Sequence, residues 1–205
     1  MPRPGLPGRI GELLIDDPAG RYVAFEVAGF GFAFSQAYLD SKKLELPKDW
    51  SDLTSAEYAG SILMPVPSRQ GFSPIIYESI LQASGWDAGW TMISGIAANS
   101  ELMGGGGMSF IDDLADAIHG LALTIDFFPK SAQMNGAPVE FHYANTPLFS
   151  PAHVAILKQA PNPDAARVFM DFVLSDAGQA LLLHRDVERL PVRPTAYTDS
   201  SAYNP

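Results

Sequence analysis

The sequence contains no cysteine, so neither a disulfide framework nor a thiolate metal site can form. Basic residues are also few: 13 Lys and Arg stand against 23 Asp and Glu, which gives a formal net charge of −10. This charge argues against a nucleic-acid backbone or an anionic membrane as the partner. It is compatible with a small anion held locally by backbone N–H groups.

Long hydrophobic runs are missing as well, and no stretch of the sequence reaches the length of a membrane span. Residues 1–14, MPRPGLPGRIGELL, lack a continuous apolar segment, so we expect no signal peptide in this chain. Residues 1–20 are rich in Pro and Gly and predict a linker or a truncated start. The 47% of hydrophobic residues in 205 is enough for a sizeable core.

Strand-like and helix-like patterns alternate along the chain, which predicts an α/β protein. Strands are expected at 21–34, 62–66, 121–128, 138–143 and 153–158. Helices are expected at 73–84, 86–97, 109–119, 162–174 and 175–184.

Apolar stripes on two of these helices predict which side chains are buried. Trp86 and Trp90 are spaced at i and i+4 with Ile93 beyond them, so both tryptophans are expected in the core. The helix 162–174 is expected to turn four residues inward, namely Val168, Phe169, Phe172 and Val173. The segment from Arg185 onward, with its prolines and polar residues, is expected to be loosely held.

The stretch 68–81, SRQGFSPIIYESIL, combines a small-residue turn with the start of a helix directly after a short apolar strand. Ser73 suits the N-cap and the proline after it suits the first helical position. Such a turn presents N–H groups and the positive end of a helix dipole, where small anions bind. The candidate ligand-binding residues here are Ser68, Arg69, Gly71 and Ser73. The alternative is an ordinary capped helix with Arg69 in solvent.

A second turn of this kind lies in 103–109, which contains four consecutive glycines. Glycines allow a ligand to approach the backbone closely. Ser109 is expected to cap the following helix, with Asp112 in a capping-box arrangement. Gly105, Gly106 and Ser109 are therefore further ligand-binding candidates, and a flexible surface loop is the alternative.

Asp126, late in its predicted strand, could accept a hydrogen bond from a ligand amine or hydroxyl, or it could pair locally. In open α/β sheets ligands bind beyond the carboxyl ends of strands, and all three candidate regions meet that condition. The four histidines are scattered without an i, i+4 pair, so the sequence predicts no metal site and no catalytic residue. The glycine run 104–107 lacks the Lys-Ser/Thr of a P-loop and the spaced glycines of a dinucleotide fingerprint, so no cofactor is expected.

The ordered motifs resemble the type 2 periplasmic solute-binding proteins of ABC importers, in the branch with ferric-iron and phosphonate binders. The resemblance covers about residues 21–193. It rests on PKDWSDLTSAEYAGSILMPVPSRQGFSP, then the Trp-rich helix, LTIDFF, and SPAHVAILKQAPNPDAARVFMDFVLSDAGQALL. It implies a small-molecule solute in a cleft between two lobes, a membrane permease as partner, and a periplasmic or extracellular, membrane-associated location.

The resemblance also implies that most of the first lobe is absent from this chain. Residues 21–148 would form the second lobe, 149–193 the return strand and C-terminal helices of the first lobe or hinge, and 194–205 a tail. An exposed lobe face could then pair with a second copy of the chain.

The expected solute is a small anion, such as a phosphonate, a phosphate ester or an iron complex, and a departure from the family pattern argues against ferric iron itself. Iron binders of this branch carry adjacent tyrosines where this sequence has Phe127 and Phe128, which cannot ligate a metal. Two other functions are left open. One is a ligand-sensing regulatory domain of the same fold, and the other is an α/β hydrolase that uses Asp126 with His119 or His153.

Overall fold

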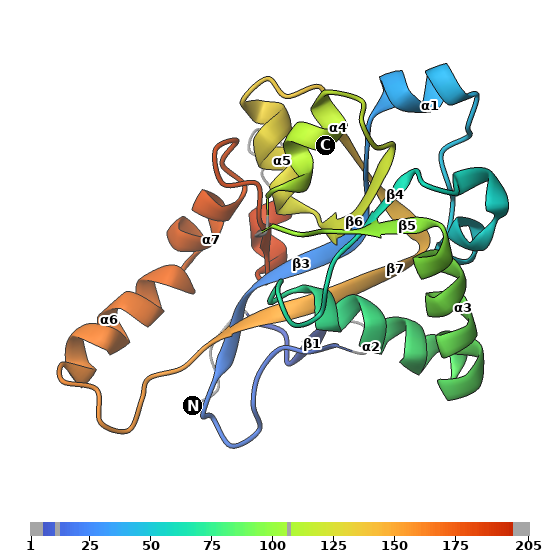
Figure 1. The fold of residues 1–205 in the computed structure, drawn as a ribbon. Helices are drawn as coiled ribbons and strands as arrows, with labels where there is room; N and C mark the ends of the chain where they lie inside the picture. Colours follow the sequence, from blue (N-terminus) through green and yellow to red (C-terminus); the bar gives the residue numbers. More distant parts are fainter. Residues whose placement is uncertain (1–5, 11–12, 106–107, 199–205) are drawn as a thin grey trace. The chain divides into compact units, whose positions relative to one another are not determined.

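Among the described residues, the larger of two sheets has six strands, and helices flank it (Figure 1). The computed structural model describes residues 6–10, 13–105 and 108–198. The strands are β1 Arg9–Ile10, β2 Leu13–Leu14, β3 Val23–Phe34, β4 Ile62–Met64, β5 Ser100–Leu102, β6 Leu121–Ile125, β7 Glu140–Val154 and β8 Leu190–Pro191. The α-helices are α1 Gln36–Lys42, α2 Ser73–Ser84, α3 Trp86–Ala98, α4 Phe110–Ala115, α5 Phe127–Met134, α6 Pro163–Val173 and α7 Asp176–Leu182. Short 3-10 helices are η1 Trp50–Thr54, η2 Ala56–Tyr58 and η3 Pro194–Tyr197.

The described residues form two compact units. Unit 2 comprises residues 29–148, and unit 1 comprises the residues up to 28 together with those from 149 onward. β3 and β7 each contribute residues to both units. The predicted α/β class is confirmed, and so are the predicted helix at 73–84 and the strand around 62–64.

The sheet of unit 2 has the order β5-β4-β6-β3-β7. β4 is parallel to both β5 and β6, whereas β3 is antiparallel to β6. On one face, Leu63 and Ala122 of the sheet pack in a single core cluster with Phe110 and Leu114 of α4 and Ala132 of α5. Because side chains alternate along a strand, the neighbours of Leu63 point to the other face, which α2 and α3 cover (Figure 1).

Helix α3 buries a different face from the one that the sequence predicted. Trp86 and Trp90 are 69% and 40% exposed, so the prediction that both lie in the core was wrong. The buried stripe is Gly89, Ile93 and Ile96. Gly89 lies so close to α2 that an added Cβ would be 2.9 Å from the Cα of Leu81. This close contact sets the rotation of α3 and turns the two indoles outward, where their rings meet edge to face.

In unit 1, α6 also presents a face that the sequence did not predict. Met170 and the following Leu174 are buried against Val23, with Val154 packed alongside. The predicted inward residues Val168, Phe169 and Phe172 are 71%, 63% and 49% exposed. The expectation was therefore wrong for these three, because the helix packs through the opposite side.

Both ends of the described chain are more ordered than the sequence indicated. Residues 6–20, expected as a linker, include β1 and β2, and Ile15 is fully buried in a unit 1 core cluster with Val192. The segment 185–198, expected to be loosely held, contains β8, which pairs with β3, and Arg189 bonds Glu26 at 2.6 Å. None of the helices in the described ranges has the length and apolar character needed to span a bilayer.

Candidate functional site

The candidate residues lie in the segments that directly follow three neighbouring parallel strands of unit 2. β5, β4 and β6 run in the same direction, so their carboxyl ends lie at one edge of the sheet. The turn 65–72 follows β4, the loop 103–109 follows β5, and Asp126 follows β6. The predicted segments are therefore brought to one edge, as the general rule for α/β sheets requires.

Gln70 joins the first two of these segments, although no pattern in the sequence marks it as a site residue. The residue is 3% exposed. Its Oε1 accepts from the backbone N–H of Val66 at 2.8 Å, and its Nε2 donates to the carbonyl oxygen of Gly105 at 2.7 Å. The exposed Arg69 adds a longer bond from Nη1 to the carbonyl oxygen of Gly104, at 3.3 Å. One buried amide thus holds both turns together.

Ser73 does not cap α2 in the predicted way. The helix begins at Ser73, with Phe72 in the N-cap position, and the Ser73 hydroxyl donates to the carbonyl oxygen of Gln70 at 3.0 Å. Ser73 is fully buried, whereas Ser68 and Gly71 are exposed. The Ser73 side chain points inward because its hydroxyl donates to the Gln70 carbonyl at the end of the turn 67–70.

The glycine loop is closely packed at one of its described positions. A Cβ added to Gly105 would lie 2.5 Å from the Cβ of Ser109, so the backbone there has no room for a side chain. Ser109 occupies the N-cap position of α4, but its side chain caps none of the described N–H groups, which corrects the predicted capping box with Asp112. The candidate Gly106 lies outside the described residues.

Asp126 is 2% exposed and begins a helix rather than continuing a strand. The predicted strand 121–128 ends at Ile125, and Phe127 is already in α5. The Oδ2 atom of Asp126 accepts from the backbone N–H of Gly29 at 2.9 Å and from the Tyr143 hydroxyl at 2.7 Å. Burial raises the pKa of Asp126, although the bonds from Tyr143 and Gly29 and the charge of Lys130 act in the opposite direction.

Lys130 and Tyr143 extend this arrangement away from the buried carboxylate. The Lys130 ammonium donates to the Tyr143 hydroxyl at 3.1 Å and lies 5.2 Å from the centre of the Tyr143 ring. Both side chains are half-buried. Neither could be found from sequence, because Tyr143 comes from β7 and the spacing to Asp126 carries no recognisable pattern.

Aromatic rings connect the turn after β4 with the helix after β6. Phe72 meets Phe128 edge to face, with ring centres 5.8 Å apart, and Phe128 meets Phe127 at 4.5 Å. The first turn of α5 is therefore in contact with the turn that carries Arg69 and Gln70. The carboxyl edge of β5, β4 and β6 therefore offers hydrogen-bond donors and the charged Arg69 beside the apolar surface of these rings.

His119 is 8% exposed and lies among carboxylates rather than near Asp126. Its Nε2 is 3.2 Å from Oε2 of Glu101, and its Nδ1 is 3.7 Å from Oδ2 of Asp113. Among the described residues no group of three His, Cys, Asp or Glu side chains is arranged to hold a metal ion.

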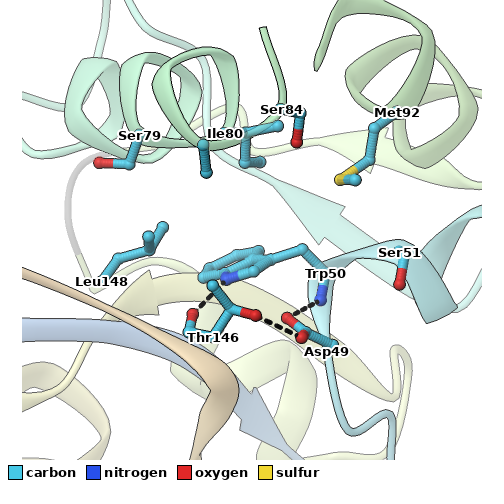
Figure 2. Close-up of a pocket in the computed structure, with 10 residues that line it drawn as sticks. Asp49, Trp50, Ser51, Ser79, Ile80, Ser84, Met92, Thr146 and Leu148 are labelled. Carbon is cyan, nitrogen blue, oxygen red and sulfur yellow. Dashed lines mark hydrogen bonds between the residues drawn. The ribbon is translucent and has the colours of Figure 1, made fainter. Parts of the chain in front are cut away.

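A cavity of about 230 Å³ lies elsewhere in unit 2 (Figure 2). In Figure 2, side chains of α2 and α3 face Trp50 and Thr146 across it. The polar atoms of that wall bond one another: the Trp50 indole donates to the Thr146 carbonyl at 3.2 Å, and the Thr146 hydroxyl donates to Asp49 at 2.6 Å. Its lining residues are Asp49, Trp50, Ser51, Ser79, Ile80, Ala83, Ser84, Met92, Thr146 and Leu148, none of which is a predicted site residue.

Solved structures of periplasmic binding proteins share this fold. AfuA from Actinobacillus pleuropneumoniae, solved with exogenous fructose-6-phosphate bound, superposes with a TM-score of 0.76 at 21% identity, over 93% of this chain and 60% of that one. The apo ferric ion-binding protein A of Pasteurella haemolytica gives 0.77 at 14% identity, over 93% and 60%. At these identities the likeness shows the fold alone, which is that of the type 2 periplasmic binding proteins.

Sequence comparison then defines the family. A family model described as "Bacterial extracellular solute-binding protein" matches residues 7–204, and the chain belongs to this family. A curated relative, the "Phosphoglycerate transport regulatory protein PgtC" of Salmonella typhimurium, is 32% identical over 172 residues. That match covers 84% of this chain and 43% of PgtC, so the chain spans less than half the length of this relative.

The family and the fold are those of binding proteins and not of enzymes. The hydrolase alternative is therefore wrong. Its proposed pairing of Asp126 with His119 is also not formed, because both ring nitrogens of His119 lie against Glu101 and Asp113.

Proposed function

We propose that this chain is part of the solute-binding component of an ABC importer and that it holds a small anionic solute at the carboxyl edge of β5, β4 and β6. The observation that carries the proposal is the pair of bonds from Arg69 and Gln70 to the glycine loop, which join two turns beside one helix start. Arg69 is exposed and can offer its remaining N–H groups to a phosphate, phosphonate or carboxylate. The twelve-residue α2 adds the positive end of its dipole.

A phosphate ester is the preferred solute class. PgtC is named for phosphoglycerate transport, and AfuA was solved with a sugar phosphate. Ferric iron is a weaker choice, because Phe127 and Phe128 offer no oxygen donors at the start of α5. An iron complex could bind the same donors only through its own anionic groups, so it is a weaker choice than a phosphate ester.

In the complete protein we assign residues 21–148 to the second lobe and 149–193 to the return strand and helices. The solute would be enclosed between two lobes, in the periplasm or in an extracellular, membrane-associated protein. Closure would follow from tighter binding to the closed state, and the closed complex would be delivered to the permease.

The proposal is tested by calorimetric titration of this chain with inorganic phosphate, 3-phosphoglycerate and fructose 6-phosphate. Arg69→Gln should weaken binding of the preferred anion by about tenfold, since a charge-assisted hydrogen bond is lost. Arg167→Gln, at an exposed arginine of α6, is the matched control and should bind normally. Failure of all three anions to bind the wild-type chain would remove the proposed site and solute class.

A ligand-sensing role is the second candidate, and the word "regulatory" in the name of PgtC favours it. The same site would then report solute to an output protein instead of a permease. Measuring whether the solute-loaded full-length protein stimulates ATP hydrolysis by its permease in vesicles separates the two roles. Stimulation supports delivery, and a solute-dependent response without stimulation supports sensing.

Pairing with a second copy is a separate proposal. It is supported by the exposed apolar side chains of α6, namely Val168, Phe169 and Phe172. Phe169→Ser should shift the mass measured by light scattering from dimer to monomer. A wild-type chain that is monomeric at all concentrations would exclude it.

A further inference from the structure

The side chains of Lys130, Tyr143 and Asp126 form a hydrogen-bonded row whose proton directions can be assigned from chemistry alone. A lysine ammonium has three donors and no acceptor, so Lys130 must donate to the Tyr143 oxygen, 3.1 Å away. The single hydrogen of the Tyr143 hydroxyl is then available for Oδ2 of Asp126, at 2.7 Å. Oδ2 also receives the backbone N–H of Gly29 at 2.9 Å, so it acts purely as an acceptor.

The buried end of this row is Asp126 and its outer end is the Lys130 ammonium. The ammonium is held in place by Tyr143 and can still bind a further group. Asp126 is buried, whereas Lys130 is half-buried. The Tyr143 hydroxyl accounts for one of the three ammonium hydrogens, and among the described residues no other acceptor or carboxylate lies within bonding distance of the Lys130 nitrogen. Two directed N–H groups and a positive charge therefore remain, in a protein whose net charge is −10.

Lys130 also lies at the same edge of the sheet as Arg69, the edge where β5, β4 and β6 end. It lies in the first turns of α5, which leaves the carboxyl end of β6. Phe128 of the same helix is in ring contact with Phe72 of the turn that carries Arg69. The Tyr143 hydroxyl stands between the buried Asp126 carboxyl and the ammonium, so the carboxyl does not lie directly against an anion bound by Lys130.

We propose that Lys130 binds the anionic group of the solute, and that Tyr143 and Asp126 are positioning residues that hold its ammonium at the strand edge. The inference rests on the proposed function, and it adds a cation that is independent of Arg69. It also predicts selectivity: a phosphate or carboxylate group is bound, whereas a neutral sugar of the same size is not.

The test is titration calorimetry with inorganic phosphate and 3-phosphoglycerate, with unphosphorylated glycerate and glucose as comparisons. Lys130→Gln should weaken phosphate-ester binding by about 10- to 100-fold and reduce its dependence on salt concentration. Lys130→Arg should restore part of the affinity because the charge is kept. Lys48→Gln is the matched control, since Lys48 is an exposed lysine of the same unit, and it should bind as the wild type does.

Tyr143→Phe separates positioning from general stability. It should weaken binding by about 3- to 10-fold in the wild type and have no further effect in the Lys130→Gln background, since the tyrosine acts through the lysine. Equal effects in both backgrounds would overturn the positioning role. If Lys130→Gln binds like the wild type, or loses no more than Lys48→Gln, the inference is overturned while the solute site at Arg69 stands. If no anion binds the wild-type chain, both proposals fail.

Discussion

The side-chain amide of Gln70 donates to the carbonyl oxygen of Gly105 at 2.7 Å, across 35 residues of sequence. The other end of the same amide accepts the backbone N–H of Val66, within its own turn. A side chain with one donor group and one acceptor group is needed to do both. Gln70 therefore makes the shape of the turn after β4 depend on the loop after β5.

Gln70→Glu isolates the bond between the two segments. The carboxylate can still accept from Val66 but places an oxygen against the carbonyl of Gly105, so that carbonyl loses its donor and the buried side chain faces a second acceptor. We expect the free energy of unfolding to fall by about 1–3 kcal/mol in urea denaturation. Gln133→Glu, an exposed glutamine of α5, makes the same chemical change and should stay within about 0.5 kcal/mol of the wild type. Equal values for the two variants would contradict the role of Gln70.

The raised pKa of Asp126 gives a pH dependence with a defined sign. Between its usual value of 3.8 and its raised value in the folded state, the folded protein holds more protons than the unfolded one. Stability contributed by this group therefore falls as the pH rises through that interval. Asp126→Asn removes the titration, so the stability of the wild type relative to this variant should decrease as the pH rises above the usual value of 3.8. A constant or increasing difference in urea denaturation would contradict it.

Asp126→Ala tests the hydrogen bonds rather than the charge. It leaves the Gly29 N–H and the Tyr143 hydroxyl without their acceptor. We expect a loss of about 1–3 kcal/mol at every pH in the same urea experiments. Asp126→Asn is the control, because its side-chain oxygen can still accept both bonds. An alanine variant as stable as the asparagine variant would show that these bonds contribute little.

Local patterns were sufficient for most elements of the fold. The proline after Ser73 and the apolar spacing of 73–84 predicted α2, and the alternation of Val23, Phe25 and Val27 predicted β3. Which face of a helix is buried depended on tertiary contacts. The close approach of Gly89 to α2 sets the rotation of α3 and leaves Trp86 exposed, although Trp86 lies on the apolar stripe of the sequence.

Part of the candidate site could likewise be predicted from local patterns, and part of it depends on tertiary contacts. Turn chemistry and the position after a strand indicated the segments around Arg69 and Gly105, because those signals are local. Tyr143 and Lys130 carry no such signal, since their meaning comes from contacts between β7 and α5. Asp126 was recognised as a candidate acceptor, but its two donors are 97 and 17 residues away in the sequence.

Gly31 gives a prediction on packing within unit 2. An added Cβ would be closest to the carbonyl oxygen of His142, well inside contact distance, and 3.0 Å from the Phe141 ring. A backbone atom in a sheet cannot move aside easily, so Gly31→Ala should destabilise the protein by about 3 kcal/mol in thermal or urea unfolding. Gly71→Ala is the control: no described atom lies within 4 Å of its Cβ position. A stable Gly31→Ala protein would show that β3 and β7 can separate at this point.

Asp17 gives a pH dependence of the opposite sign in unit 1. Its Oδ2 accepts from the backbone N–H and from Nε of Arg21 at 2.9 and 2.8 Å, and these bonds hold the pKa of Asp17 well below its usual range. A lowered folded-state pKa contributes stability that is present above about pH 4 and is lost as the pH falls toward the folded-state value. Asp17→Asn should therefore be less stable than the wild type at neutral pH, and the difference should shrink on acidification. Asp171→Asn, at an exposed aspartate of α6, removes the same charge without touching Arg21, and equal convergence of both variants with the wild type would assign the effect to net charge.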